Sequence, residues 1–273
     1  MMTDQGFQIL YSNRALVLDS GEFSEGKRER RRYLVVGDLH IGFESRFRNS
    51  GISIQSTVKP MVSEISSLLE TYKITDLLIN GDLKSGVDRI SQSEWENVPS
   101  FLESLTDSCK ISVIPGNHDG GLRHLLPDGV ELLDGGGLLI SGWLVFHGNS
   151  RPLDKFRNCR RIVIGHLHPI FQEKGSPLSG QPVWVIARVE RKRIFEQVLG
   201  DSGEIEEEGD LVEVIVMPAF NRELIISGFV PDVARQERKN APMLRSLRTS
   251  EDALVMTLNG EIIGDASTLQ RIL

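Results

Sequence analysis

The 273-residue sequence has only two cysteines, Cys109 and Cys159, which are too few for a disulfide framework or a cysteine zinc site. It has no apolar run of the roughly 18–20 residues that a membrane span requires, which argues against an integral membrane protein. Residues 1–6 lack the basic and apolar regions of a secretory signal. Together these absences predict a cytoplasmic protein.

The sequence also lacks an excess of positive charge. It carries 31 Lys and Arg against 38 Asp and Glu, a net charge of −7, which argues against a protein that coats nucleic acid non-specifically. Hydrophobic residues make up 40% and charged residues 25%, values that are ordinary for a globular protein. The length suits either one large α/β domain or two smaller ones.

Short apolar strands, each ending in a polar cluster, recur along the chain. They are 33–36 before Gly37-Asp38-Leu39-His40, 77–79 before Asn80-Gly81-Asp82, 111–114 before Pro115-Gly116-Asn117-His118-Asp119, 143–146 before His147-Gly148, and 162–164 before Gly165-His166-Leu167-His168. Helical patterns separate the first three strands. The apolar spacing predicts a helix over 58–72 with Ser56 as N-cap, and a second over 93–105 in which Pro99 marks either a kink or the start. Strands that alternate with helices predict parallel βαβ units.

After about residue 130 the pattern becomes rich in strands. Strands are predicted over 130–133, 138–140, 183–189, 211–217 and 224–227, with a tight turn at Ser141-Gly142 and a C-terminal hairpin around Asn259-Gly260. Two charge runs, 27–32 and 204–210, are interpreted as solvated loops or turns. This order of elements predicts two packed sheets with flanking helices.

Five of the six histidines follow the ends of these strands: His40, His118, His147, His166 and His168. Ligands of open α/β sheets bind at the carboxyl ends of strands. A single buried histidine is usually a structural residue, but five beside Asp38, Asp82 and Asn117 indicate a metal site. Carboxylate oxygens with imidazole nitrogens suit Mn²⁺, Fe or Zn²⁺.

The ordered motifs resemble those of the calcineurin-like metallophosphoesterase superfamily. They are Asp38-x-His40, Gly81-Asp82, Gly116-Asn117-His118-Asp119, His147 and Gly165-His166-x-His168, and they span about half of the chain. Residues 41–44, Phe47-Arg48, 81–84 and 218–221 further resemble the ICC-like phosphoesterase branch. Some members of that branch are associated with DNA ligase and helicase genes, which implies a DNA-repair nuclease with such a partner.

The resemblance implies a four-layer α/β/β/α metallophosphoesterase sandwich of two mixed sheets. Residues 1–230 would form the catalytic domain, and residues 231–273 a linker and a C-terminal β-hairpin extension packed on it. The implied metal ligands form two sets: Asp38, His40 and His168 for one ion, and Asn117, His147 and His166 for the other, with Asp82 as the bridge. His118 would lie beside the phosphate and Asp119 would orient its ring. The family often has Asp or Arg where this sequence has Ser85, so a contact outside the metal site differs.

Substrate contacts are less sharply predicted. Arg46, Arg48 and Lys84 lie near the metal motifs and are candidate contacts for the phosphate, with ordinary surface charge as the alternative interpretation. Two basic clusters, 157–161 and 188–193, would track a nucleic-acid backbone if both lay on the metal face.

The predicted reaction is in-line attack of a metal-bound hydroxide on a phosphodiester of nucleic acid or a nucleotide, with His118 as general acid. Two divalent ions would be required, with Mn²⁺ as the first expectation and Fe or Zn²⁺ as alternatives. A phosphomonoesterase or cyclic-nucleotide hydrolase with the same site is the second hypothesis. A non-catalytic scaffold is the third, and the intact set of implied ligands argues against it.

Overall fold

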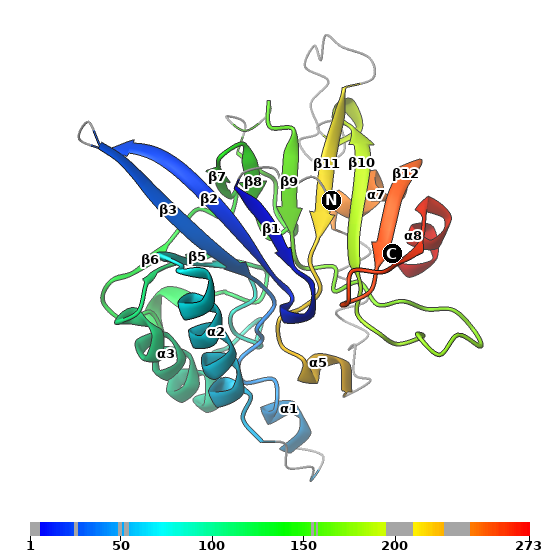
Figure 1. Cartoon of the computed structure of the whole chain (residues 1–273). Coiled ribbons are helices and arrows are strands. Elements are labelled where there is room, and N and C mark those ends of the chain that lie inside the picture. Colours follow the sequence, from blue (N-terminus) through cyan, green and yellow to red (C-terminus); the bar gives the residue numbers. More distant parts are fainter. Residues whose placement is uncertain are drawn as a thin grey trace.

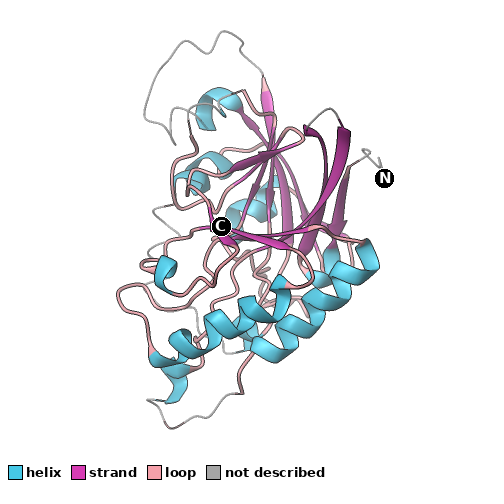
Figure 2. Ribbon diagram, turned by 90° about the vertical axis from the view of Figure 1, so that its left-hand side faces the viewer, coloured by secondary structure: helices cyan, strands magenta, loops and turns pink. Residues whose placement is uncertain are grey.

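The computed structural model describes residues 6–24, 27–48, 51, 55–153, 156, 158–194, 210–226 and 241–273; for residues 21–24, 27–29, 46, 48, 225, 226 and 242 it describes the backbone alone. Two mixed β-sheets pack face to face, and helices cover both outer sides (Figure 1). Figure 2 shows the long helices against one side of the strands and short helices against the other. The predicted four-layer α/β/β/α architecture is confirmed.

The first sheet has the strand order β1-β2-β3-β4-β5-β6. Its strands are Phe7–Leu10, Ala15–Ser24, Lys27–Val36, Asp76–Asn80, Lys110–Ile114 and Val130–Leu132. Strands β3 to β6 are parallel to one another, as the alternation of strands and helices predicts. All five residues of β4 are buried, which explains its continuous apolar run.

The second sheet has the order β13-β12-β10-β11-β9-β8-β7. Its strands are Ile262–Gly264, Asp252–Met256, Trp184–Glu190, Leu211–Val216, Arg161–Ile164, Trp143–Val145 and Leu138–Ile140. Strands β8, β9 and β11 are parallel, and the other pairings are antiparallel. The predicted C-terminal hairpin is β12–β13, and it extends this sheet because β12 pairs with β10. Of the linker predicted over residues 231–246, residues 231–240 lie outside the described part of the chain. The rest of the prediction is wrong, because Pro242–Leu247 form a helix, α7.

The helices cover the two sheets separately. Helices α2 (Val58–Tyr72) and α3 (Gln92–Thr106) contribute apolar side chains to the core against the first sheet, and α7 (Pro242–Leu247) and α8 (Ala266–Ile272) do so against the second. The predicted helix over 58–72 is confirmed, although Thr57 rather than Ser56 is its N-cap. The second predicted helix begins at Gln92 and continues through Pro99, so the proline is an interior residue. A third core, which includes Leu16, Val35 and Trp184, lies between the sheets.

Two further predictions about local structure are wrong. Residues Leu224–Ile226, predicted as strand, belong to the short helix α5 (Glu223–Ile226); the side chain of Asn221 accepts a hydrogen bond from the Glu223 amide, as at a helix N-terminus. The run 27–32 is part of β3 rather than a loop, because it pairs with β2 along its length. Residues 204–209 of the acidic run lie outside the described part of the chain.

The topology brings the predicted functional motifs to one place. Parallel strands present their carboxyl ends at the same edge of a sheet, so the loops after β3, β4 and β5 are neighbours, and so are those after β8 and β9. The two sheets then place both sets of loops against each other. Within the described residues, no helix is both long and apolar enough to cross a membrane.

Candidate metal centre

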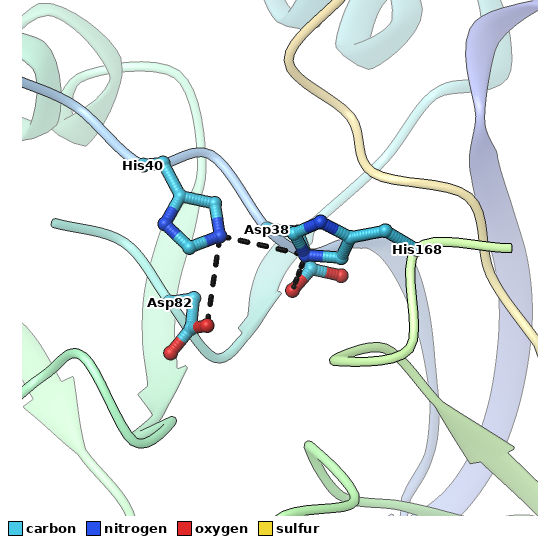
Figure 3. Close-up of side chains that lie close together, drawn as sticks. All are labelled: Asp38, His40, Asp82 and His168. Atoms are coloured by element: carbon cyan, nitrogen blue, oxygen red, sulfur yellow. Dashed lines mark hydrogen bonds and ion pairs between the residues drawn. The ribbon is translucent and has the colours of Figure 1, made fainter. Parts of the chain in front are cut away.

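Four side chains from the loops after β3, β4 and β9 converge in the first half of the site (Figure 3). His168 Nε2 lies 2.8 Å from Asp38 Oδ1, and His40 Nε2 lies 3.4 Å from His168 Nε2. His40 Nε2 also lies 3.5 Å from Asp82 Oδ2. One potential ligand atom from each of these four residues lies within 4.8 Å of the others, a spacing that can hold a metal ion.

The second half shares Asp82 with the first. Asp82, His147 and His166 form another group whose ligand atoms lie within 4.8 Å of one another. His147 Nδ1 lies 2.9 Å from the carbonyl oxygen of Asn80. A carbonyl can only accept a hydrogen bond, so Nδ1 carries the proton and Nε2 is directed at Asp82 Oδ2, 3.2 Å away. Asp82 therefore occupies the shared position that the sequence resemblance implies.

The loop after β5 carries the Asn117-His118-Asp119 motif to the same centre. The His118 amide donates a hydrogen bond of 2.9 Å to Asp82 Oδ1, which places the preceding Asn117 beside the shared carboxylate. His118 Nε2 lies 3.9 Å from Asp82 Oδ2, so the ring faces the centre. The carboxylate of Asp119 accepts hydrogen bonds from the amides of Gly116 and Lys84.

The contact expected between Asp119 and His118 is made by another group. His118 Nδ1 lies 2.7 Å from the main-chain oxygen of Ser85, so this carbonyl takes the place that we expected the Asp119 carboxylate to fill. Asp119 instead stabilises the loop on which His118 lies. The reason is local: both Asp119 oxygens face main-chain amides.

Five of the implied ligands have a strained backbone. Asp38, His40, Asp82, His166 and His168 have φ between 37° and 64°, the left-handed region that non-glycine residues rarely adopt. Such a conformation costs about 1–3 kcal/mol per residue and persists only where the surrounding structure enforces it. Because the strained residues include five implied ligands, we infer that the fold keeps this backbone conformation to bring their side chains together, at a cost in local stability.

Two glycines leave room for this convergence. A Cβ atom on Gly81 would lie 2.2 Å from His147 Nδ1, and one on Gly116 would lie 2.2 Å from Asp82 Oδ1. Any larger residue at either position would displace a side chain of the centre. The glycine before Asp82 and the glycine before Asn117 are therefore required by close packing.

The electrostatics of the site favour cation binding. Burial opposes ionisation of Asp38 and Asp82, but neighbouring histidines outweigh it, and the pKa of each carboxyl is held below its ordinary value. Burial lowers the pKa of His40 to about 3 and that of His166 to about 3. Both rings are thus neutral at pH 7, as metal ligands must be.

The charge and contacts of the His147 ring show whether the site fits a metal ion. Burial disfavours its charged form, yet Asp82 and Asp38 raise the pKa of His147 to about 10, so a proton compensates the two buried carboxylates. Its Nε2 atom is fully buried and makes no hydrogen bond within the described residues. Nε2 nevertheless lies 3.2 Å from Asp82 Oδ2 and 3.9 Å from Asp38 Oδ1. The positive charge on His147 thus compensates two buried carboxylates, which is the role that a shared divalent cation would take here.

The expected substrate contacts are only partly described. The side chain of Lys84 is fully buried and its Nζ atom donates to the carbonyl of Gly86, so it does not present its charge to a substrate. Arg46 and Arg48 lie in α1 (Ser45–Arg48), but their side chains are outside the described part of the structure.

The two basic clusters do not line the metal face. Arg161 begins β9, whereas the implied ligands His166 and His168 follow the other end of that strand. Arg188 pairs in register with Glu213, which in turn pairs with Arg161, so both clusters lie at the opposite end of the second sheet. Ion pairs with Asp252, Asp210 and Glu190 further compensate Arg188, Arg191 and Arg193. Residue 157 is outside the described residues.

Sequence reasoning missed the groups that orient the rings. The carbonyls of Asn80 and Ser85 hold His147 and His118, and a main-chain oxygen leaves no trace in residue type. The buried Glu94, which binds the Ser85 loop, could have been found from the capping-box pattern Ser91-x-x-Glu94.

We expect metal-reconstituted protein to bind two divalent ions per chain, because the shared Asp82 belongs to both ligand groups. His168→Ala and His166→Ala should each lower the stoichiometry, since each changes one group. His124 is exposed and lies outside both groups, so His124→Ala is the matched histidine control. Elemental analysis combined with calorimetric titration checks this. Saturation of the wild-type protein at one ion would contradict the two-ion centre.

A comparison with known protein families covers the part of the chain that carries these motifs. Residues 31–187 match the family model of the calcineurin-like phosphoesterases, which is more than half of the chain. Among solved structures, the nuclease MPE of Pseudomonas putida is 18% identical, with a TM-score of 0.46 over 77% of this chain and 80% of that one. The phosphoesterase YfcE of E. coli is 14% identical, with a TM-score of 0.37 over 85% and 97%. A protein of unknown function from Aquifex aeolicus, AQ665, is 17% identical, with a TM-score of 0.33 over 53% and 81%. A search of curated proteins found no match.

Proposed function

This chain belongs to the calcineurin-like phosphoesterase family, and on that premise we propose that it is a dinuclear phosphodiesterase acting on nucleic acid or nucleotides. Family membership establishes the class of reaction, which is metal-dependent hydrolysis of a phosphoester. The number of ions, the roles of individual residues and the substrate are the parts that we propose.

One observation carries the proposal: two groups of ligand atoms share Asp82, and His118 Nε2 faces the same carboxylate. A scaffold protein would have no need to keep five buried or nearly buried ligands in a strained conformation. The arrangement supports catalysis.

Two divalent cations bound here would supply Lewis acidity and a water molecule of lowered pKa. Asp38, His40 and His168 would hold the first, and Asn117, His147 and His166 the second, with Asp82 between them. The Asn80 carbonyl keeps His147 in the tautomer whose Nε2 can ligate. His118, with Nδ1 bound to Ser85, directs Nε2 at the centre and would donate a proton to the leaving oxygen.

The placement of the basic clusters narrows the proposed substrate. Binding of a long duplex depends mainly on contacts with many phosphates. The net charge is −7 and the two clusters lie away from the centre, which favours a nucleotide or a short single-stranded segment. A monoester or cyclic nucleotide is the competing substrate class.

Manganese is the ion that we propose first, because the donor set combines carboxylate oxygens with imidazole nitrogens and contains no thiolate. Zinc or iron would compete by intrinsic affinity in purified material. The low cysteine content favours a reducing compartment such as the cytoplasm. A DNA-repair helicase or ligase partner follows from the sequence resemblance alone.

We expect phosphodiesters to be hydrolysed with kcat/KM at least about tenfold above phosphomonoesters, because a monoester carries a second negative charge and Lys84, which could compensate it, is buried and donates to the Gly86 carbonyl. The measurement is a panel of single-stranded DNA, duplex DNA, RNA, cyclic nucleotides and phosphomonoesters with added Mn²⁺. A monoester that exceeds every diester would overturn the diester assignment and support the competing one.

The variant Arg188→Glu is the control for the substrate class. It reverses a charge in a cluster at the far end of the second sheet, so relative rates on single-stranded DNA should not change. A selective loss on DNA would show that this surface does contact the backbone.

A further inference from the structure

The loop of residues 84–86, between β4 and α3, controls the orientation of His118. The Ser85 carbonyl lies 2.7 Å from His118 Nδ1. Since a carbonyl only accepts, Nδ1 carries the proton, and Nε2 is the nitrogen left to face Asp82 at 3.9 Å. Any shift of the Ser85 peptide would therefore rotate the ring or release its tautomer.

The side chain of Glu94, which lies in α3, forms hydrogen bonds with the backbone of this loop. Its Oε1 atom accepts hydrogen bonds from the amides of Ser85 at 2.9 Å and Gly86 at 2.5 Å. Its Oε2 atom accepts from the Ser91 amide at 2.6 Å and from Ser91 Oγ at 2.8 Å. The bond from the Ser91 amide, together with the one that the Glu94 amide donates to Ser91 Oγ, is an ordinary capping box at the start of α3. The first pair is an additional contact, which connects the helix to the His118 loop.

The space around this carboxylate is closed. Glu94 is 1% exposed, and a Cβ atom on Gly42 would lie 2.7 Å from its Cγ atom. A Cβ atom on Gly86 would lie 3.1 Å from Oε2. Four donors thus depend on one buried side chain: the buried Ser85 amide, and the half-buried Gly86 amide, Ser91 amide and Ser91 hydroxyl. Buried amides that lose their acceptor are costly, so the loop would rearrange if the carboxylate were lost.

The peptide groups on either side of these two are also hydrogen-bonded. Lys84 Nζ donates to the Gly86 carbonyl, and the Lys84 amide donates to Asp119 Oδ1 at 3.2 Å. The loop backbone therefore bonds two side chains of opposite charge. The Glu94 carboxylate accepts from two of its amides, and the Lys84 ammonium donates to one of its carbonyls. A solvent-exposed turn does not need this many side-chain hydrogen bonds to its backbone. These bonds leave the Ser85 carbonyl directed at His118.

We propose that Glu94 is a positioning residue for His118 that acts through the Ser85 peptide. The proposal rests on the proposed function, because it takes His118 to be the proton donor whose orientation matters. It also accounts for Ser85, where the family often has Asp or Arg, since the contact uses only the main chain. Glu94 itself does not touch the reacting atoms.

The test compares Glu94→Gln with Glu44→Gln. Glu44 is also buried, and it accepts from the Thr57 amide and Thr57 Oγ1 at the start of α2, so it is a matched capping carboxylate without a link to His118. In Glu94→Gln an amide nitrogen replaces one of the two acceptor oxygens, so the side chain can no longer accept from both the Ser85 loop and Ser91. We expect this variant to lose at least about tenfold in kcat on a dinucleotide, whose alkoxide leaving group needs the proton, and little on a nitrophenyl diester. Glu44→Gln should show no such selectivity, and both variants should keep two metal ions.

A second readout needs no turnover. In the metal-free protein, nitrogen-15 NMR of the six histidines should show the Nδ1–H tautomer of His118, assigned by its absence in His118→Asn. This resonance should move or broaden in Glu94→Gln and stay unchanged in Glu44→Gln. An unchanged His118 resonance, or an equal loss on both substrates, would overturn the proposal. If Glu94→Gln fails to fold, Glu94→Asp, which shortens the reach of the carboxylate, is tested in the same way.

The variant His118→Asn separates the two levels of the proposal. If this variant shows leaving-group selectivity and Glu94→Gln does not, the positioning role fails alone. If His118→Asn itself shows none, the acid role in the proposed function fails. In the double variant, the selective loss caused by Glu94→Gln should disappear, because its effect passes through the ring.

Discussion

The Asp82→Asn variant should lose nearly all hydrolytic activity and bind neither metal ion tightly. Asp82 Oδ2 lies 3.2 Å from His147 Nε2 and 3.5 Å from His40 Nε2, so one carboxylate serves both ligand groups. These histidines hold the pKa of Asp82 well below its ordinary value despite its burial, and the variant removes that negative charge. Lewis-acid stabilisation is worth several kcal/mol, so its loss should lower kcat on the order of 10³-fold.

The fold should survive this substitution. The amide oxygen of asparagine can still accept the hydrogen bond that the His118 amide donates to Asp82 Oδ1. Thermal unfolding of the metal-free proteins checks this, and chelated wild-type protein sets the lowest rate to be expected. His166→Ala is the comparison, because it changes the second group only. If Asp82→Asn kept its activity while His166→Ala lost it, the shared role of Asp82 would be wrong.

The His118→Asn variant should retain both ions and still lose a large part of its rate. Its Nε2 atom faces Asp82 at 3.9 Å, and its amide hydrogen bond to Asp82 does not depend on the side chain. General acid catalysis typically contributes about 10²–10⁴-fold, and its value depends on how much the leaving oxygen needs a proton. The loss should therefore approach this range for a ribose or deoxyribose alkoxide and be small for a nitrophenolate.

Metal content and two substrates decide this result. Elemental analysis of the variant should give the same stoichiometry as wild type. An equal loss of rate on both substrates would mean that His118 stabilises or positions the phosphate rather than donating a proton. Loss of an ion would mean that His118 is a ligand.

Much of the centre is readable in the sequence because its parts are local. Each apolar strand ends directly before its ligand, as in Asp38 after β3 and Asp82 after β4, and strand ends in parallel sheets meet. The glycines of these motifs are also local requirements, since Gly81 and Gly116 leave room for His147 and Asp82. Residue type and order were thus sufficient to predict a metal site at the strand ends, and the family resemblance implied two ligand groups around Asp82.

Which end of a strand lies near the metal centre cannot be predicted from local sequence in this way. The clusters at 157–161 and 188–193 are basic in the sequence, but their distance from the metal face depends on which end of β9 and β10 they occupy. Likewise, residues 27–32 are too charged to predict as strand, but pairing with β2 and ion pairs with Asp19 and Asp76 stabilise them there. Residues 224–226 are apolar, yet the side chain of Asn221 caps a helix at that point.

The carboxylates, imidazoles and glycines of the centre could be predicted from residue type and from their place at the ends of apolar strands, and the family resemblance added the phosphoesterase chemistry. How each ring is held depends on the packing of the folded chain. His118 contacts the Ser85 carbonyl rather than the Asp119 carboxylate, and Glu94 reaches that loop from a separate helix. The physical reason is that every residue carries the same carbonyl and almost every residue the same amide. Which of them lies 2.7 Å from an imidazole depends on the packing of distant segments, and residue type does not encode it.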